Sequence, residues 1–252
     1  MPTTVVFVGP AGSGKSSIVA AYAKWLREGE IPVVTVNLDP AAEYIPYEPD
    51  IDVRQYVNAR DVAIKYGLGP NGALVKSMEL IAEKLSDILA PLSTMEADYI
   101  LVDTPGQMEV FVFRDISTKL VEELKKYSSE IYGIFVVDAT VVRDPADYAF
   151  TYVMALSIQL RLGIETAPVL NKIDAAPNLD IRGDLVRDLA KLRRGLMKKH
   201  SLYAEMLRDV VRVLFKYAKQ VNVPRISAAT GEGIEDLHKL IHEMSCNCGD
   251  LS

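Results

Sequence analysis

Residues 9–17, GPAGSGKSS, combine glycine, lysine and serine at a spacing that suits a bound phosphate chain. The glycines let backbone N–H groups turn toward an anion, and the start of a helix adds partial positive charge. Lys15 can reach the terminal phosphates, and the Ser16 hydroxyl can bind Mg²⁺. An apolar segment precedes the run and a helical pattern follows it, which is the setting that this loop requires. The pattern predicts phosphate contacts from Gly12, Ser13, Gly14, Lys15, Ser16 and Ser17.

A second group of polar residues follows the apolar segment at 98–102. Asp103 is expected to lie beside the phosphate loop and to hold Mg²⁺, and Gly106 to offer its backbone N–H to a γ-phosphate. Gln107 is a candidate for positioning an attacking water, with Glu109 as a second candidate. Asp39, just past another apolar segment, is expected to contact the Mg²⁺ shell or to orient that water. The alternative for Asp39 is a turn, because Asp-Pro favours turns.

The segments LNKID at 170–174 and RISAATGEG at 225–233 predict a guanine site. Asp174 can accept hydrogen bonds from N1–H and the exocyclic amino group of guanine. Adenine lacks this pair of donors, and a buried Asp left half paired would therefore reject it. Asn171 is expected to brace the loops, and the stem of Lys172 to cover the base. Ser227 and Ala228 end the last predicted strand, where the Ala228 N–H can bond guanine O6.

These motifs need a scaffold that brings them to one edge, and the alternation of strand and helix patterns predicts one. Several predicted strands are almost continuously apolar, which suits strands buried on both faces of a parallel sheet. The alternation favours an α/β fold with a doubly wound, mostly parallel sheet flanked by helices, as in P-loop NTPases. The predicted strands are 3–9, 32–38, 98–104, 131–139, 167–172 and 222–228. The predicted helices include 16–28, 73–90, 109–126, 146–162 and 232–244.

The chain is predicted to form a single domain over residues 1–252, with two insertions. No linker or internal repeat divides it, and its length suits one large α/β domain. One insertion covers about 39–97. The other covers about 175–221 and has the pattern of two helices, the first of them strongly basic. A solvated helix face explains such charges, and a partner-binding surface is the alternative.

Composition excludes several classes of function. The 252 residues are 49% hydrophobic and 25% charged, with a net charge of −6, so no direct binding of nucleic acid is expected. No apolar run approaches the roughly 18 residues of a membrane span, and the N-terminal residues lack a signal-peptide pattern. Cys246 and Cys248 are too close for an easy disulfide and too few for a zinc site. They are expected to be reduced thiols, which favours the cytoplasm.

The order of these motifs resembles the P-loop GTPases. The run YGLGPNGALVKS at 66–77 makes the resemblance more specific, although such a run taken alone would be only a turn. Its tripeptide Gly69, Pro70 and Asn71, inside the first insertion, resembles the GPN-loop GTPases, and the likeness extends over essentially the whole chain. That family implies a homodimer in which the tripeptide of one subunit reaches the partner's phosphate site. Its eukaryotic members are linked to RNA polymerase assembly, which implies a protein client.

Some features of other GTPases are missing. No threonine lies between Thr35 and Thr94, so the Mg²⁺-binding switch threonine of small GTPases is absent. Pro10 stands where dimerising relatives of the signal-recognition and partitioning classes often carry a second lysine. Arg54 and Arg60 are candidate arginine fingers without a signature. The Asn71 amide is therefore expected to help stabilise charge on the γ-phosphoryl group.

Two rival functions stay open at this point. One is a P-loop kinase, which would need an acceptor site and arginines in a lid. The other is a nucleotide-gated assembly factor with negligible hydrolysis, in which the tripeptide is a dimer contact alone. The sequence favours a homodimeric Mg²⁺-dependent GTPase that converts GTP to GDP and phosphate and acts as a switch for protein assembly.

Overall fold

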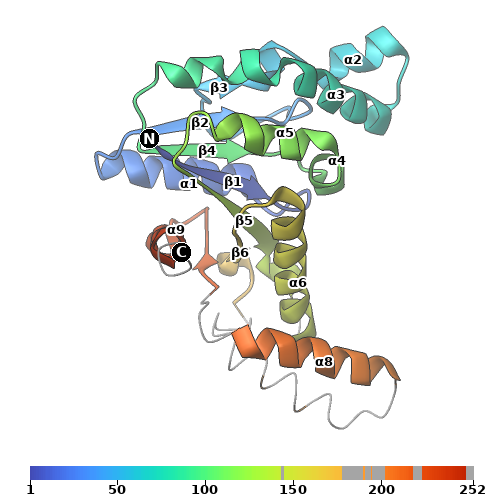
Figure 1. Ribbon diagram of the computed structural model, residues 1–252, viewed down its shortest axis with the longest axis vertical. Coiled ribbons are helices and arrows are strands. Elements are labelled where there is room, and N and C mark those ends of the chain that lie inside the picture. The colour runs from blue at the N-terminus through green and yellow to red at the C-terminus, as the bar shows by residue number, and fades with distance from the viewer. Residues whose placement is uncertain (143–144, 178–189, 191–193, 195–201, 218–222, 248–252) are drawn as a thin grey trace.

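A single seven-stranded sheet forms the centre of the protein in the computed structural model, which describes residues 1–142, 145–177, 190, 194, 202–217 and 223–247 (Figure 1). The strand order is β3-β2-β4-β1-β5-β6-β7, and the pairings between described strands are parallel. The strands are β1 Thr3–Val8, β2 Val33–Asn37, β3 Ile51–Asp52, β4 Tyr99–Asp103, β5 Glu130–Asp138, β6 Thr166–Asn171 and β7 Arg225–Ile226.

Helices cover both faces of this sheet (Figure 1). A hydrophobic core lies on each face of the sheet, and alternate side chains of β1 point into one core or the other. Val5 and Phe7 pack with α1 and α9, whereas Val6 and Val8 pack toward α3, α5 and α6. This arrangement confirms the predicted doubly wound α/β fold. The helices are α1 Lys15–Glu28, α2 Ala59–Tyr66, α3 Pro70–Leu89, α4 Met108–Val112, α5 Asp115–Leu124, α6 Pro145–Leu162, α8 Leu202–Tyr217 and α9 Ile234–Asn247.

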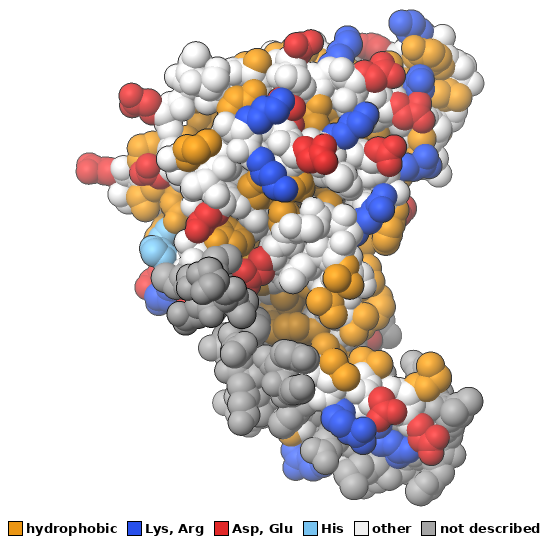
Figure 2. Space-filling model, viewed as in Figure 1, with side chains coloured by type: hydrophobic (Ala, Val, Ile, Leu, Met, Phe, Trp, Pro, Cys, Tyr) orange, Lys and Arg blue, Asp and Glu red, His pale blue; other side chains and the backbone are white. Residues whose placement is uncertain are grey.

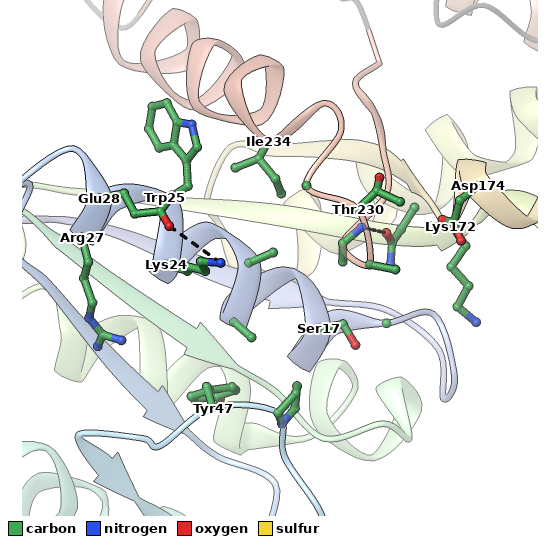
Figure 3. A pocket seen from close by; sticks show the side chains of 18 of the residues that line it. Ser17, Lys24, Trp25, Arg27, Glu28, Tyr47, Lys172, Asp174, Thr230 and Ile234 are labelled. Carbon is green, nitrogen blue, oxygen red and sulfur yellow. Dashed lines mark hydrogen bonds and ion pairs between the residues drawn. The ribbon is translucent and has the colours of Figure 1, made fainter.

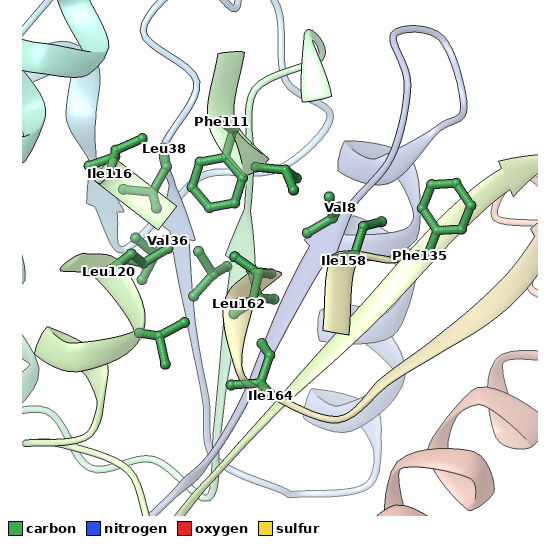
Figure 4. Close-up of a cluster of buried hydrophobic side chains, with 14 of the residues drawn as sticks. Val8, Val36, Leu38, Phe111, Ile116, Leu120, Phe135, Ile158, Leu162 and Ile164 are labelled. Atoms are coloured by element: carbon green, nitrogen blue, oxygen red, sulfur yellow. The ribbon is translucent and has the colours of Figure 1, made fainter. Parts of the chain in front are cut away.

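The larger core anchors the short helix α4, which directly follows residues 103–107, the DTPGQ segment. Phe111 of α4 is 1% exposed and belongs to the cluster that contains Val8, Leu38 and Leu120 (Figure 4). Burying one such side chain contributes about 1.5–3 kcal/mol. This packing therefore holds α4 against the sheet and fixes where the residues before it emerge.

Local structure differs from the predicted elements at three places. The predicted helix over 109–126 is two helices, because Arg114 is extended, with φ of −110°, between α4 and α5. The two-residue edge strand β3 was not predicted, since it is too short to show a period. The predicted helix from 73 begins earlier, at Pro70, and Gly67, with φ of 64°, ends α2 before it.

The second insertion is described only in part. Its second predicted helix corresponds to α8. Most of its first predicted helix, Cys248 and the side chain of Cys246 lie outside the described residues. The boundaries of the single domain and of both insertions stay predictions. No helix in the described part of the chain has the length and apolar character to cross a membrane.

Candidate functional site

The phosphate loop joins β1 to α1 and needs glycine at two positions. Gly12 and Gly14 have φ of 77° and 89°, in the left-handed region that favours glycine. A Cβ atom on Gly14 would also come within 2.3 Å of Asn171 Nδ2. The backbone of this loop is therefore free to curl in a way that side chains at these positions would prevent.

Lys15 lies inside the phosphate loop, with 5% of its surface exposed. Its Nζ donates hydrogen bonds to the carbonyl oxygens of Gly9, at 3.0 Å, and Pro10, at 3.2 Å. Burial lowers the pKa of Lys15, while the negative charges of Asp103 and Asp39 oppose that change. The lysine is thus held where phosphate oxygens can replace the two carbonyl groups.

Asp103 ends β4 beside the phosphate loop and is 1% exposed. Its Oδ2 accepts a 3.2 Å hydrogen bond from the Tyr47 hydroxyl, and its Oδ1 has no hydrogen-bond partner in the described part of the chain. Burial raises the pKa of Asp103 to about 6, against the opposing influence of the nearby Ser16 hydroxyl and Lys15 charge. A buried carboxylate oxygen without a partner is one that a ligand is expected to satisfy.

The donor set around Asp103 fits a magnesium ion that arrives with a nucleotide. Mg²⁺ is usually held by one or two carboxylates together with phosphate oxygens and water. Ser16 and Asp103 offer one hydroxyl and one carboxylate here. Among the described residues, no group of three or more His, Cys, Asp or Glu side chains is placed to hold a metal by itself. The site therefore suits a metal shared with a phosphate chain.

Asp39 lies opposite the DTPGQ turn. Its Oδ1 accepts from the Ala41 N–H at 2.9 Å, and its Oδ2 accepts from the Gly106 N–H at 3.3 Å. Gln107 follows as the partly exposed N-cap of α4, and Glu109 is exposed in the first turn of that helix. The structure thus brings Asp39, Gly106 and Gln107 to one edge of the sheet, and it leaves Glu109 in solvent.

A cleft of about 970 Å³ extends from the phosphate loop along α1 (Figure 3). Figure 3 shows Ser17 and Tyr47 on one side of it and Lys172, Asp174 and Thr230 on the other. The cleft joins the predicted phosphate and base segments. Its lining includes Gly14, Ser17, Pro46, Tyr47, Asn171, Lys172, Asp174, Ala228 and Thr230.

Asn171 forms hydrogen bonds to two other loops of this cleft. Its Nδ2 donates to the Ser13 carbonyl at 3.0 Å, and its Oδ1 accepts from the Ala228 N–H at 3.1 Å. The Ala228 N–H is the group expected to bond guanine O6. Guanine O6 would therefore have to share this N–H with Asn171 Oδ1 or replace that oxygen as its acceptor. Lys172 has φ of 65°, and its Nζ forms a 2.6 Å ion pair with Asp138.

Asp174 differs in one respect from the expectation. It accepts a 2.6 Å hydrogen bond from the Ser227 hydroxyl, but it is exposed, not buried. The carboxylate that was expected to be buried is therefore exposed in this structure. A base that covered this carboxylate would bury it, and selectivity for guanine would then develop as the base binds.

The tripeptide Gly69, Pro70 and Asn71 lies apart from this cleft. Gly69 is the N-cap of α3, and Pro70 occupies its first turn. Asn71 is exposed, and within the described residues its side chain makes no hydrogen bond or ion pair. In Figure 1 the α2–α3 connection lies at the outer end of the molecule, beyond β3. None of the three residues lines the cleft at the phosphate loop of the same chain.

Two residues at this site, Tyr47 and Asp138, were not predicted from the sequence. Tyr47 reaches Asp103 across 56 positions, and Asp138 pairs with Lys172 across 34. Asp138 ends an apolar strand next to the NKID strand, and that position was its available signal. Tyr47 lies in a loop with no period, so the sequence carries no comparable signal for it.

The parallel sheet, the phosphate loop and the acidic end of β4 define a P-loop NTPase. A family model described as "Conserved hypothetical ATP binding protein" matches residues 7–247. The chain is 38% identical to the GPN-loop GTPase PAB0955 of Pyrococcus abyssi, over 98% of this chain and 99% of that one. It is 31% identical to GPN-loop GTPase 1 of Dictyostelium discoideum, over 95% of this chain and 61% of that one.

The crystal structure of Pyrococcus abyssi PAB0955, described as a GTPase in apo form, superposes with a TM-score of 0.86. The match covers 98% of each chain at 36% identity. The chain therefore belongs to the GPN-loop GTPase family, and the predicted family resemblance is confirmed. The family model's description mentions ATP, whereas the relatives are called GTPases. The residues that contact the base must decide between the two nucleotides.

Proposed function

We propose that this protein is a Mg²⁺-dependent GTPase that hydrolyses GTP to GDP and phosphate. The observation that carries the proposal is one cleft that runs from Gly14 and Ser17, the two residues that flank Lys15 and Ser16 in the phosphate loop, to Asp174. Asp174 presents one carboxylate oxygen not taken by Ser227, and guanine offers two donors to such a group where adenine offers none. This chemistry favours GTP over ATP.

The proposed mechanism relies on positioning and charge. Lys15 releases its two carbonyl oxygens and binds phosphate oxygens, and the Gly106 N–H turns from Asp39 to the γ-phosphate. Asp39 and Gln107 then orient a water for in-line attack. Ser16 and Asp103 would hold Mg²⁺, which supplies charge neutralisation on the phosphates when it is bound. Glu109 is the weaker candidate for positioning the water, because it is exposed to solvent on the first turn of α4.

We further propose that the protein acts as a homodimer, with Gly69, Pro70 and Asn71 of one subunit at the partner's phosphates. In support, Asn71 is exposed and lies outside its own nucleotide cleft. Exposed apolar side chains accompany it: Ile64 is 77% exposed and Tyr66 43%. Burying such side chains favours association.

We also propose a role as a nucleotide-driven switch for protein assembly, which the contacts of α4 support. Arg161 of α6 donates hydrogen bonds to the Val112 carbonyl at 3.2 Å and to the Phe113 carbonyl at 3.4 Å, at the end of α4. A movement of the DTPGQ turn would therefore reach α6. Exposed apolar residues continue on α6 and the adjoining α8, where Figure 2 shows hydrophobic side chains gathered. They are Phe150, Leu156, Leu160, Met206, Val210 and Val213.

We propose that this surface of α6 and α8 contacts a protein client in the cytoplasm, related to RNA polymerase if the family resemblance extends to the client. Membrane and nucleic acid are not proposed as partners. Hydrogen exchange across α8 is expected to differ between the GDP state and the state with a non-hydrolysable GTP analogue. Identical exchange in both states would contradict the coupling.

Turnover of radiolabelled GTP tests the proposed activity. We expect release of phosphate that needs Mg²⁺ and does not need an acceptor, which separates a GTPase from a kinase. Lys15→Ala removes the cation at the phosphates and is expected to abolish turnover while the protein stays folded. Lys84→Ala, which changes an exposed lysine of α3 outside the cleft, is the control and should keep normal turnover. Equal rates for the wild type and Lys15→Ala would rule out this site.

A further inference from the structure

The backbone at Asp39 is held by a chain of hydrogen bonds that connects it to Asp52. The Asn37 side chain lies between the two ends of this chain and is fully buried. Its Oδ1 accepts from the Asp39 N–H at 3.0 Å, and its Nδ2 donates to Asp52 Oδ1 at 3.0 Å. Asn37 and Asp52 are neighbours in the sheet, at the paired ends of β2 and β3. The backbone at residue 39 is thereby attached to the Asp52 carboxylate.

Arg54 completes the attachment from the other side of the loop. Its Nε and Nη2 contact Asp52 at 3.0 Å and 2.6 Å, and its Nη1 donates to the Ala42 carbonyl at 2.9 Å. The loop that carries Asp39 is therefore held at residue 39 through Asn37 and at residue 42 through Arg54. Both points of attachment converge on one carboxylate.

The geometry also removes Arg54 from the candidates for an arginine finger. Its guanidinium donates to two groups of its own chain, and its side chain is only 25% exposed. Burial alone would raise the pKa of Asp52, but the hydrogen bonds from Arg54 and Asn37 outweigh it and lower that pKa below its usual value. The Asp52 side chain is 10% exposed. A bidentate ion pair that is shielded from solvent in this way fixes the positions of its two side chains better than a solvated pair does.

We propose that the Asp52–Arg54 ion pair is a positioning device for hydrolysis that acts through Asp39. The pair holds the loop so that the Asp39 carboxylate faces the Gly106 N–H and the place of the attacking water. This inference rests on the proposed function, because it assigns a role within that reaction. Misplacing a reacting group by about 1 Å can cost a hundredfold in rate.

The chain offers a matched control two residues before the pair. Asp50 also accepts from β2, since the Thr35 N–H and hydroxyl donate to its Oδ2 at 2.7 Å and 2.8 Å. It also faces an arginine, Arg27, at 3.5 Å. Asp50 has no hydrogen bond to the loop over 39–42 among the contacts of the described residues. Replacing the Asp50 carboxylate should affect folding about as much as replacing Asp52 does, but it should not move Asp39.

The test compares Asp52→Asn, Arg54→Lys and the control Asp50→Asn in the full-length protein. Asp52→Asn and Arg54→Lys should lower kcat for GTP by about tenfold to a hundredfold, while KM and the affinity for GDP stay within about twofold of wild type. Asp50→Asn should leave kcat unchanged. Asp39→Asn combined with Asp52→Asn should be no slower than Asp39→Asn alone, because both act through one group.

A second readout does not involve catalysis. In nucleotide-free protein, hydrogen exchange at the Gly106 amide should become faster in Asp52→Asn but not in Asp50→Asn, because the acceptor is no longer fixed. Wild-type kcat in both Asp52→Asn and Arg54→Lys would overturn the inference, as would multiplicative losses in the double variant. If the wild type itself hydrolyses no GTP, the proposed function fails instead. The two failures are therefore distinguishable.

Discussion

The backbone N–H of Gly106 donates a hydrogen bond to Oδ2 of Asp39, at 3.3 Å, across 67 positions of the chain. Gly106 is the residue whose N–H is expected to meet a γ-phosphate, so an aspartate occupies that donor in the structure. A γ-phosphate oxygen and the Asp39 carboxylate would compete for it. The loop after β2 and the turn after β4 are thus linked at the residue that is expected to contact a γ-phosphate.

This competition predicts a pattern of amide exchange at Gly106. Asp39→Ala removes the acceptor, and the Gly106 amide should exchange faster in nucleotide-free protein. A GTP analogue with Mg²⁺ should restore protection in the variant, because the γ-phosphate accepts the same N–H, and GDP should not. Hydrogen exchange resolved to this residue provides the measurement. Equal protection by GDP and by the analogue would contradict the assignment of Gly106.

Asp174→Asn should change which base is bound. The variant replaces an acceptor with an amide group, so guanine loses hydrogen bonds to a charged group that are each worth about 1.5–3 kcal/mol. Xanthine carries a carbonyl where guanine has its amine and should then be preferred. Competition titrations with GTP, xanthosine triphosphate and ATP measure the change. ATP binding as tight as GTP binding by the wild type would refute the predicted guanine site.

Asp103 should make the stability of the nucleotide-free protein depend on pH. Its pKa is about 6 in the folded protein and about 3.9 in an unfolded chain. The folded state binds more protons between these values, so the contribution of Asp103 to stability falls as the pH rises through this window. The Asp103→Asn variant lacks the titrating carboxyl group, so this contribution to the pH dependence of stability should be absent from it.

Urea unfolding with a metal chelator present compares the two proteins at about pH 4 and about pH 7. The free energy of unfolding of the wild type, relative to Asp103→Asn, should fall by about 2 kcal/mol between these pH values. A difference that stays constant with pH would show that burial does not raise the pKa of Asp103 in solution.

Local patterns predicted the parts of the site whose partners are close in sequence. Lys15 and the two glycines before it lie in one short run, and the chemistry of a phosphate loop requires those residue types together. The doubly wound sheet was predicted for a similar reason, since buried parallel strands are apolar along their length. The predicted fold and family are confirmed, whereas the roles of the site residues stay predictions.

Long-range partners account for most of what sequence analysis missed. Asn37, Asp52 and Arg54 meet because β3 pairs with β2, and a strand of two residues has no detectable period. Tyr47 was missed for the same reason, because its contact with Asp103 depends on how the loop folds back. The exposure of Asp174 could not be predicted from the sequence either, since the burial of a side chain at a ligand site depends on whether the ligand is present.

In the proposed homodimer, Asn71 acts at the nucleotide of the partner subunit. Asn71→Ala should leave GTP affinity nearly unchanged and lower kcat by about a hundredfold, the usual effect of losing one donor to developing charge. Gly72→Ala is a suitable control, because the atoms nearest to a Cβ atom there are those of the Leu68 side chain, at 3.6 Å or more, which is ordinary contact. These rates alone do not distinguish action on the partner from action within one chain.

Mixing two inactive variants makes that distinction most directly. A dimer of one Lys15→Ala subunit and one Asn71→Ala subunit has a site on the latter that keeps its own Lys15 and receives Asn71 from its partner. After confirmed subunit exchange of equal amounts, GTP turnover should rise to about a quarter of the wild-type rate, because half of the dimers then carry one intact site. Turnover that stays as slow as in the separate variants would contradict action of Asn71 on the partner's nucleotide.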